Sequence, residues 1–363
     1  MALAMGDVER KLEGRVVFTQ LDRPQFGFDV FTVDLPHNLN AIKTFELTVD
    51  KRLTDGTSIN YNAQFVGTAD AKLFLSQKKN HVFTTSESEL DEIDAGAETV
   101  VFVSERSGSA RIHLSAAAKT EKDDALRRLS MGPLKGIAGF FFDRPVINKE
   151  RVFFVSTQEK PAHKPIASWC AVYSTCLRTG DTVRLTPQGV TDFSPSISPS
   201  GKGMAVASYG VTKEWEVVFK EDLADLYVFD AEDGSGRKMV AENGGWPSWA
   251  DENTIYFHRR APDGFWSIYR LNLLDAQSKS FIPFTAVMNP EIHHYNPFIS
   301  ADSLKLGFHR FRGEEAPDAD TVVPFLEPVE SPIPTLALQR INGYFPTFSP
   351  DASLVAKTAG FMS

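Results

Sequence analysis

Residues 193–210 read FSPSISPSGKGMAVASYG, and the order of residue types in this stretch decides the fold. Pro195 opens a short strand-like segment, and Ser198–Gly201 follows it with Pro199 at the second position of a turn. Proline suits that position because its φ is already fixed near the value that the turn needs. The apolar run Met204–Ala207 comes next. The stretch therefore predicts a strand, a turn and a second strand.

The same pattern returns four more times along the chain. The other copies are residues 143–157 (DRPVINKERVFFVST), 245–260 (GWPSWADENTIYFHRR), 295–310 (YNPFISADSLKLGFHR) and 344–360 (YFPTFSPDASLVAKTAG). Their aligned prolines are Pro145, Pro195, Pro247, Pro297 and Pro346, which lie 50, 52, 50 and 49 residues apart. Such even spacing indicates a repeat architecture with about 50 residues in each unit.

Each unit continues beyond its second strand. After residues 193–210, Asp225–Asp230 predicts a third strand, and Lys238–Val240 begins a fourth after a turn. The same features recur in Ala171–Tyr173, Val183–Thr186 and Trp266–Leu271. Four strands in a period of about 50 residues are typical of one blade of a β-propeller. No helical period of 3.6 is sustained, and residues 116–128 are expected to form a short helix or a solvated loop.

The N-terminal part fits the same scheme but begins in the middle of a blade. Val16–Thr19 resembles a second strand, Phe28–Val33 a third, and Lys51–Thr54 the end of a fourth. A complete blade then follows, with strands predicted at Ser58–Phe65, Thr99–Val103 and Ala110–Leu114. First strands thus occur six times, and the last unit ends soon after its second strand. Joining the two chain ends would complete a blade and leave no open edge, whereas an unjoined last blade would stay incomplete.

Two long segments carry a resemblance to a known family. Residues 169–210 and 225–260, together with FGFDVFTVDL at 26–35 and LTDGTSINYNAQF at 53–65, closely resemble plant TolB-related proteins. That family is also similar to the N-terminal propeller of dipeptidyl peptidases. The resemblance implies an all-β, six-bladed TolB-like β-propeller with four-stranded blades, in one domain over residues 1–363. The bacterial namesake is a periplasmic protein-binding propeller, whereas the peptidases add a hydrolase domain.

The composition and the net charge make some classes of function and partner less favourable than others. The net charge of −9 disfavours binding to nucleic acids or anionic membranes, because phosphate binding needs a positive field. The chain has two cysteines and neither a signal-peptide pattern nor a run of 18 apolar residues. We therefore expect a soluble monomer in the cytoplasm, with the nucleus as the alternative. Residues 1–14 are expected to be disordered, and the acidic, proline-rich residues 314–334 to form a mobile insertion.

The strong sequence motifs of catalysis are missing. There is no Gly-x-Ser-x-Gly turn, no Gly-rich phosphate loop, and no Cys-x-x-Cys or His-Glu-x-x-His. We therefore predict no catalytic residues, no cofactor and no metal. His258 and His309 occupy matching places in two units and favour a structural role. The alternative is a metal held by histidines in the channel, which His293 or His294 could face. The aromatic residues Trp246, Trp249, Trp266 and Tyr269 favour core between blades over a sugar-stacking surface.

The candidate binding site lies where the first strands begin, at one mouth of the central channel. Residues at these starts differ between units while the strands keep their pattern, and variation on a fixed scaffold is how loops carry function. The candidate ligand-binding residues are Asn60, Asp192, Gly245, His293, His294 and Tyr344. We expect a non-enzymatic propeller that presents this mouth to a protein or a small ligand. The alternatives are a carbohydrate-active hydrolase or lyase with its site in the channel, and an inactive truncated paralogue.

Overall fold

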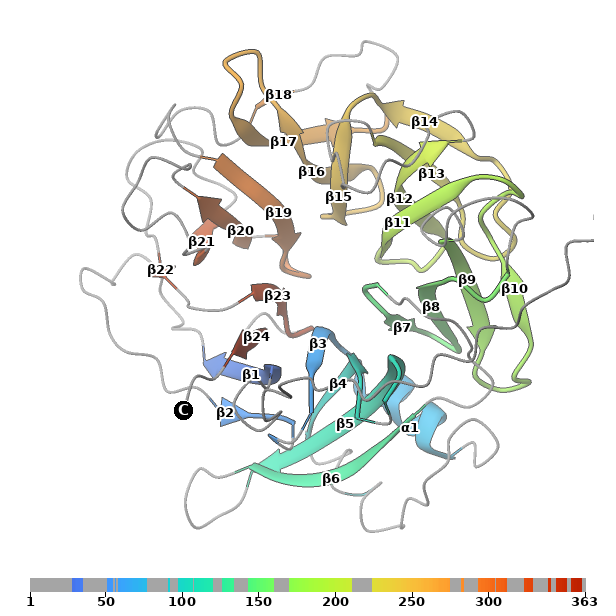
Figure 1. Cartoon of the computed structure of the whole chain (residues 1–363), viewed down its shortest axis with the longest axis vertical. Coiled ribbons are helices and arrows are strands. Elements are labelled where there is room, and N and C mark those ends of the chain that lie inside the picture. Colours follow the sequence, from blue (N-terminus) through green and yellow to red (C-terminus); the bar gives the residue numbers. More distant parts are fainter. Residues whose placement is uncertain are drawn as a thin grey trace, which may run out of the picture.

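The computed structural model describes residues 28–34, 51–54, 56, 58–76, 91, 97–106, 108–119, 126–133, 143–159, 170–210, 224–274, 282–283, 293–303, 305–311, 323–328, 339–340, 344–350 and 354–360. Within these residues the strands form six four-stranded sheets, and every strand pair that has been assigned is antiparallel. The sheets are arranged around a common axis (Figure 1). The predicted all-β propeller is thereby confirmed.

Each sheet presents its strands to the axis in the order expected of a blade. The strands nearest the axis are β3 (Asn60–Phe65), β7 (Val146–Asn148), β11 (Thr191–Ile197), β15 (Gly244–Trp249), β19 (His293–Ile299) and β23 (Tyr344–Phe348). The second strands are β4 (Glu98–Ser104), β8 (Arg151–Ser156), β12 (Gly203–Gly210), β16 (Thr254–Arg260), β20 (Lys305–Phe311) and β24 (Leu354–Gly360).

The outer half of each sheet is built in the same way. The third strands are β5 (Arg111–Lys119), β9 (Ala171–Cys176), β13 (Asp225–Asp230), β17 (Trp266–Asn272), β21 (Val323–Pro328) and β1 (Phe28–Asp34). The fourth strands are β6 (Leu126–Pro133), β10 (Thr182–Arg184), β14 (Lys238–Ala241), β18 (Ile282–Pro283), β22 (Gln339–Arg340) and β2 (Lys51–Arg52). The helix α1 (Thr68–Ser76) follows β3.

One sheet contains strands from both ends of the chain. β1 pairs with β24 over seven residues, from Phe28↔Gly360 to Asp34↔Leu354. Of the two alternatives for the last blade, the structure shows the one in which N-terminal strands complete the sheet, with β1 third and β2 fourth. Its second place belongs to β24, whereas the sequence pattern assigned a second strand to residues 16–19. Those residues lie outside the described part, as do residues 1–14.

Three local expectations need correction. In the stretch 116–128, the described residues are strand and not helix or loop: those up to Lys119 continue β5, and those from Leu126 belong to β6. β21 occupies Val323–Pro328 inside the predicted mobile insertion, because each sheet needs a third strand to pair with its second. The helix α1 was not predicted. Among the residues of α1 whose burial is described, only Ala71 and Phe74 are completely buried, which is too few positions to reveal a helical period.

The apolar core lies between neighbouring sheets. One cluster joins Val101 and Leu114 of one sheet to Phe154 and Tyr173 of the next. The aromatic prediction holds for Trp249 and Tyr269, which are buried with 8% and 7% of their surface exposed, whereas Trp246 and Trp266 are half-buried. The indole of Trp249 also donates to the Ser196 carbonyl of the neighbouring sheet at 3.0 Å. Packing between blades therefore uses directed polar contacts as well as apolar area.

Candidate functional site at the propeller axis

Five of the six strands nearest the axis share a β-bulge at one position. The register shifts by one residue between Tyr61/Gln64, Phe193/Ser196, Gly245/Ser248, Tyr295/Phe298 and Tyr344/Thr347. Within four of these bulges a residue has a positive φ, namely Asn62 (54°), Ser194 (50°), Trp246 (51°) and Asn296 (51°). Arg144, just before β7, has a φ of 34°. Backbone strain of this kind is concentrated where proteins bind ligands or carry out chemistry.

The repeat prolines mark these strained positions. Arg144, Ser194, Trp246 and Asn296 each precede one of the aligned prolines, and Asn62 precedes Ala63. A residue before proline normally adopts an extended backbone, so a left-handed backbone there must be held by the surrounding structure. We name Asn62, Asp143, Arg144, Ser194, Trp246 and Asn296 the axial cluster.

A buried acid anchors the axial cluster. The carboxylate of Asp143 accepts hydrogen bonds from Asn62 Nδ2 at 3.3 Å and from Ser194 N and Oγ at 2.8 and 3.3 Å. It therefore joins residues from three different sheets. Burial raises the pKa of Asp143, while the charge of Arg144 and the bonds from Ser194 act in the opposite direction. The side chain is 6% exposed.

The side chain of the neighbouring Arg144 contacts a sheet other than its own. Its Nη1 donates to the Pro247 carbonyl at 3.3 Å, and its Cζ lies 4.6 Å from the centroid of the Trp246 ring. Burial lowers the pKa of Arg144 to about 10, so the guanidinium is charged at neutral pH. The residue is 7% exposed, and its Nε has no hydrogen-bond partner among the described residues. Asn62 Oδ1 and Asn296 Oδ1 are likewise buried and unpartnered.

Two buried histidines stand behind the cluster. The backbone N–H of Asn296 donates to His258 Nδ1 at 3.0 Å, and its side-chain Nδ2 lies 3.2 Å from His309 Nδ1. Burial lowers the pKa of His258 to about 3 and that of His309 to about 4. Both rings are therefore neutral at pH 7. In the described part of the chain, no three His, Cys, Asp or Glu side chains come together in a way that could hold a metal ion.

The six predicted site residues do lie at the starts of strands nearest the axis, but most are not surface groups. Asn60 and Asp192 are fully buried. The amide of Asn60 donates to Asp29 Oδ1 at 2.8 Å, and its Oδ1 accepts a hydrogen bond from Arg106 at 3.3 Å. Their polar atoms are thus engaged within or beside their own sheets.

Asp192 forms the most complete of these internal networks. Its carboxylate pairs with both terminal nitrogens of Arg237, at 2.9 and 2.7 Å, and accepts from Thr186 Oγ1 at 2.7 Å. Arg237 also donates to Ser208 Oγ at 3.0 Å and lies 4.4 Å from the centroid of the Tyr227 ring. These contacts connect the first three strands of one blade to the residue just before the fourth, and they are sufficient to explain why an acid stands at this position.

The other four predicted residues differ among themselves. Gly245 packs against His258, since a Cβ at residue 245 would lie 2.5 Å from the ring Nε2. His294 is 5% exposed and contacts the Phe308 ring edge-on, whereas His293 is half-buried and accepts a hydrogen bond from the Trp266 backbone. Tyr344 begins β23. That any of the six contacts a ligand stays a prediction.

The structure brings together a different set from the one read from the sequence. The axial cluster lies one or two residues further along the strands than the predicted positions, and four of its six members stand immediately before a repeat proline. The signal that could have found it is the change of residue type before those prolines, from Arg to Ser, Trp and Asn. Packing of the repeats alone does not require the residue type to change at that position, whereas recognition of a ligand by several different side chains does.

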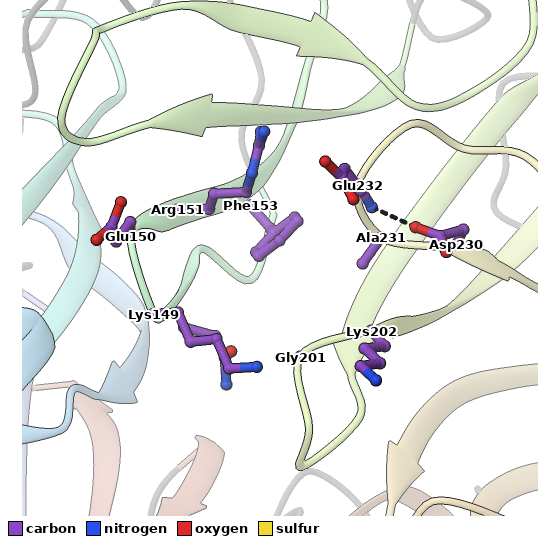
Figure 2. Close-up of a pocket in the computed structure, with 10 residues that line it drawn as sticks. Lys149, Glu150, Arg151, Phe153, Gly201, Lys202, Asp230, Ala231 and Glu232 are labelled. Carbon is purple, nitrogen blue, oxygen red and sulfur yellow. Dashed lines mark hydrogen bonds between the residues drawn. The ribbon is translucent and has the colours of Figure 1, made fainter.

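A pocket lies at the other ends of the strands. A pocket of about 400 Å³ lies where the turn after β7, the turn after β11 and the turn after β13 meet (Figure 2). Its charged lining residues are Lys149, Glu150, Arg151, Lys202, Asp230 and Glu232. Glu150 pairs with Arg178, and Arg151 donates to Ser174 Oγ at 2.8 Å. The pocket has cations and anions in equal number, so it offers no surplus charge to a ligand.

Known proteins share this fold at low sequence identity. A structure assigned as TolB from Agrobacterium tumefaciens is 12% identical, with a TM-score of 0.56 over 93% of this chain and 99% of that one. TolB from Acinetobacter baumannii is 16% identical, with a TM-score of 0.44 over 73% of this chain and 60% of that one. An oligogalacturonate lyase in complex with manganese is 11% identical, with a TM-score of 0.46 over 91% and 77%. Only the first of these supports the TolB-like fold, and none bears on activity.

Sequence comparison gives the family. No curated protein matched the chain. The sequence profile of the dipeptidyl peptidase IV N-terminal region matches residues 8–215, which is more than half of the chain. The described residues contain no helix long and apolar enough to cross a membrane. The match, the bulged strands around the axis and the six four-stranded sheets agree, and the chain belongs to the dipeptidyl peptidase IV N-terminal region family.

Proposed function

We propose that this protein is a non-enzymatic binding propeller that holds a small ligand, or a segment of a partner protein, at the axial cluster. In this proposal the six sheets are the complete ring of a six-bladed propeller, closed by the sheet that contains β1 and β24. The rigid ring fixes the positions of the binding side chains, and the chemistry of recognition comes from the few residues that differ at the bulges.

One observation carries the proposal. Three polar atoms of the axial cluster, Asn62 Oδ1, Arg144 Nε and Asn296 Oδ1, are buried without a hydrogen-bond partner in the described part of the chain. Most buried polar atoms in proteins are hydrogen-bonded, and each exception costs about 1–3 kcal/mol. A bound molecule with matching donors and acceptors would supply the missing partners. Other buried polar atoms without a partner among the described residues, such as Thr32 Oγ1 and Asn148 Oδ1, lie away from the bulges. These three stand beside the axis, so a single bound molecule could account for them together.

The two buried histidines near the axis favour binding over catalysis. General acids and bases work best when their pKa is near the operating pH. The pKa of His258 is about 3 and that of His309 about 4, so neither ring exchanges protons readily at pH 7. This supports the non-enzymatic proposal over a hydrolase or lyase in the channel.

The test is a high-resolution crystal structure of the purified protein, before and after soaking with a mixture of amino acids, hydroxy acids and neutral sugars. We expect a non-protein molecule within hydrogen-bonding distance of Arg144 Nε and Asn62 Oδ1. The Arg144→Lys variant, soaked in parallel, should lose that density. An axis that contains only ordered water in both crystals would contradict the proposal.

A further inference from the structure

We infer that the ligand of the axial cluster is a small hydroxycarboxylate with a single negative charge, held by the guanidinium of Arg144. This inference rests on the proposed function and deepens it. It is carried by the free edge of the guanidinium, by the charges around it and by the two unpartnered amide oxygens.

The guanidinium has one edge left for a ligand. Nη1 is directed at the Pro247 carbonyl, and the Trp246 ring covers one face of the group. Nε is buried and unpartnered, and the described residues provide no hydrogen bond to Nη2. The Nε and Nη2 hydrogens of arginine point in parallel, at the spacing of the two oxygens of a carboxylate. These two hydrogens can therefore donate to both oxygens of one carboxylate and hold it in the plane of the guanidinium.

The local charges favour a single negative charge on the ligand. Arg144 forms no ion pair with another side chain among the described residues, although Asp143 lies next to it in the chain. The Asp143 carboxylate is directed at Asn62 and Ser194. His258 and His309 are neutral and add no positive charge. A dianion such as phosphate would meet one cation beside one acid, with too little positive charge to offset its desolvation.

The unpartnered amide oxygens indicate the rest of the ligand. Asn62 Oδ1 and Asn296 Oδ1 are acceptors, because the Asn62 amide nitrogen is used by Asp143 and the Asn296 amide nitrogen lies against His309 Nδ1. An acceptor needs a donor, and a hydroxyl group next to a carboxylate supplies one. Half-buried Trp246 beneath the guanidinium adds an apolar surface for the carbon skeleton. A carboxylate, a hydroxyl and a short carbon chain together describe a hydroxycarboxylate.

The experiment is a calorimetric titration of the whole chain with four probes: sodium L-lactate, sodium acetate, L-lactamide and inorganic phosphate. We expect lactate to bind more tightly than acetate, which lacks the hydroxyl, and lactamide and phosphate to bind at least about tenfold more weakly than lactate. Arg144→Lys should weaken lactate about tenfold or more, since lysine cannot form the two parallel bonds. Arg178→Lys, at an exposed arginine far from the axis, is the matched control and should leave binding unchanged.

A second variant keeps the test informative if Arg144→Lys does not fold. Asn62→Ala leaves the guanidinium in place, so it should remove the preference for lactate over acetate while both still bind. Phosphate binding as tight as lactate binding, lactamide binding equal to lactate, or no lactate binding at all would each overturn the inference. If lactamide binds and Asn62→Ala abolishes that binding, the proposed function still stands, because a ligand then occupies the axis although its charge is not recognised.

Discussion

Replacing Arg237 with Met should destabilise the fold by about 3–5 kcal/mol, because it leaves the Asp192 carboxylate buried without its charge partner. Asp192 is fully buried and receives both terminal nitrogens of Arg237, at 2.9 and 2.7 Å. After the substitution only Thr186 Oγ1, at 2.7 Å, still donates to it from a side chain. The lost stacking on Tyr227, at 4.4 Å, adds roughly 0.5–1 kcal/mol.

The assay is equilibrium unfolding in urea, followed by tryptophan fluorescence, with the unfolding free energy extrapolated to water. The double variant Asp192→Asn with Arg237→Met should recover part of the loss, because an amide buries no charge. The control Arg178→Met removes an exposed ion pair with Glu150 and should leave the unfolding midpoint unchanged. A loss below about 1 kcal/mol for Arg237→Met, or no recovery in the double variant, would refute the buried ion-pair reasoning.

Three further predictions follow from single contacts. Because the pKa values of His258 and His309 fall from 6.5 to about 3 and about 4 on folding, the unfolded chain binds more protons below pH 6.5. The unfolding free energy should therefore decrease as the pH falls from 6.5 towards 4, and His309→Asn should flatten that slope in urea titrations at several pH values. Gly245→Ala should cost about 1–3 kcal/mol in the same assay, because its Cβ would lie 2.5 Å from His258 Nε2, and a neutral result would contradict that clash. Trp249→Phe should cost about 1 kcal/mol or more, because the Ser196 carbonyl loses its donor, and an unchanged thermal midpoint would show that the hydrogen bond is dispensable.

The sequence was sufficient to predict the architecture because the repeat consists of features that act locally. A proline, a turn and an apolar run recur every 50 residues or so, and each feature acts within a few residues of itself. Even the closing sheet could be foreseen, since β1 and β24 are incomplete units at the two ends of the chain. The helix α1 was missed because its burial is decided by the neighbouring sheet, through Phe74, and not by a pattern along the helix.

The candidate site was predicted less well, for a reason visible at two residues. Asp192 and Asn60 look like variable polar residues at the mouth of a channel, but their partners Arg237 and Arg106 lie 45 and 46 positions away. A hydrogen bond between such distant positions leaves no local mark in a single sequence. Arg144 was overlooked because an arginine before proline looks like an ordinary turn residue, and only the folded ring directs its side chain to Pro247.

The pairing of β1 with β24 has a consequence for how the protein is made. Of the described strands, β1 is synthesised first and β24 last. Until β24 is added, the sheets between them can therefore form only an open row. Until β24 arrives, the apolar faces at the two outer flanks of that row have no neighbour. Contacts between distant parts of a chain form slowly, because the intervening segment must first be brought round. We therefore expect the pairing of β1 with β24 to be a late and slow step of folding, so a substitution that weakens either strand should lower the yield of folded protein during expression.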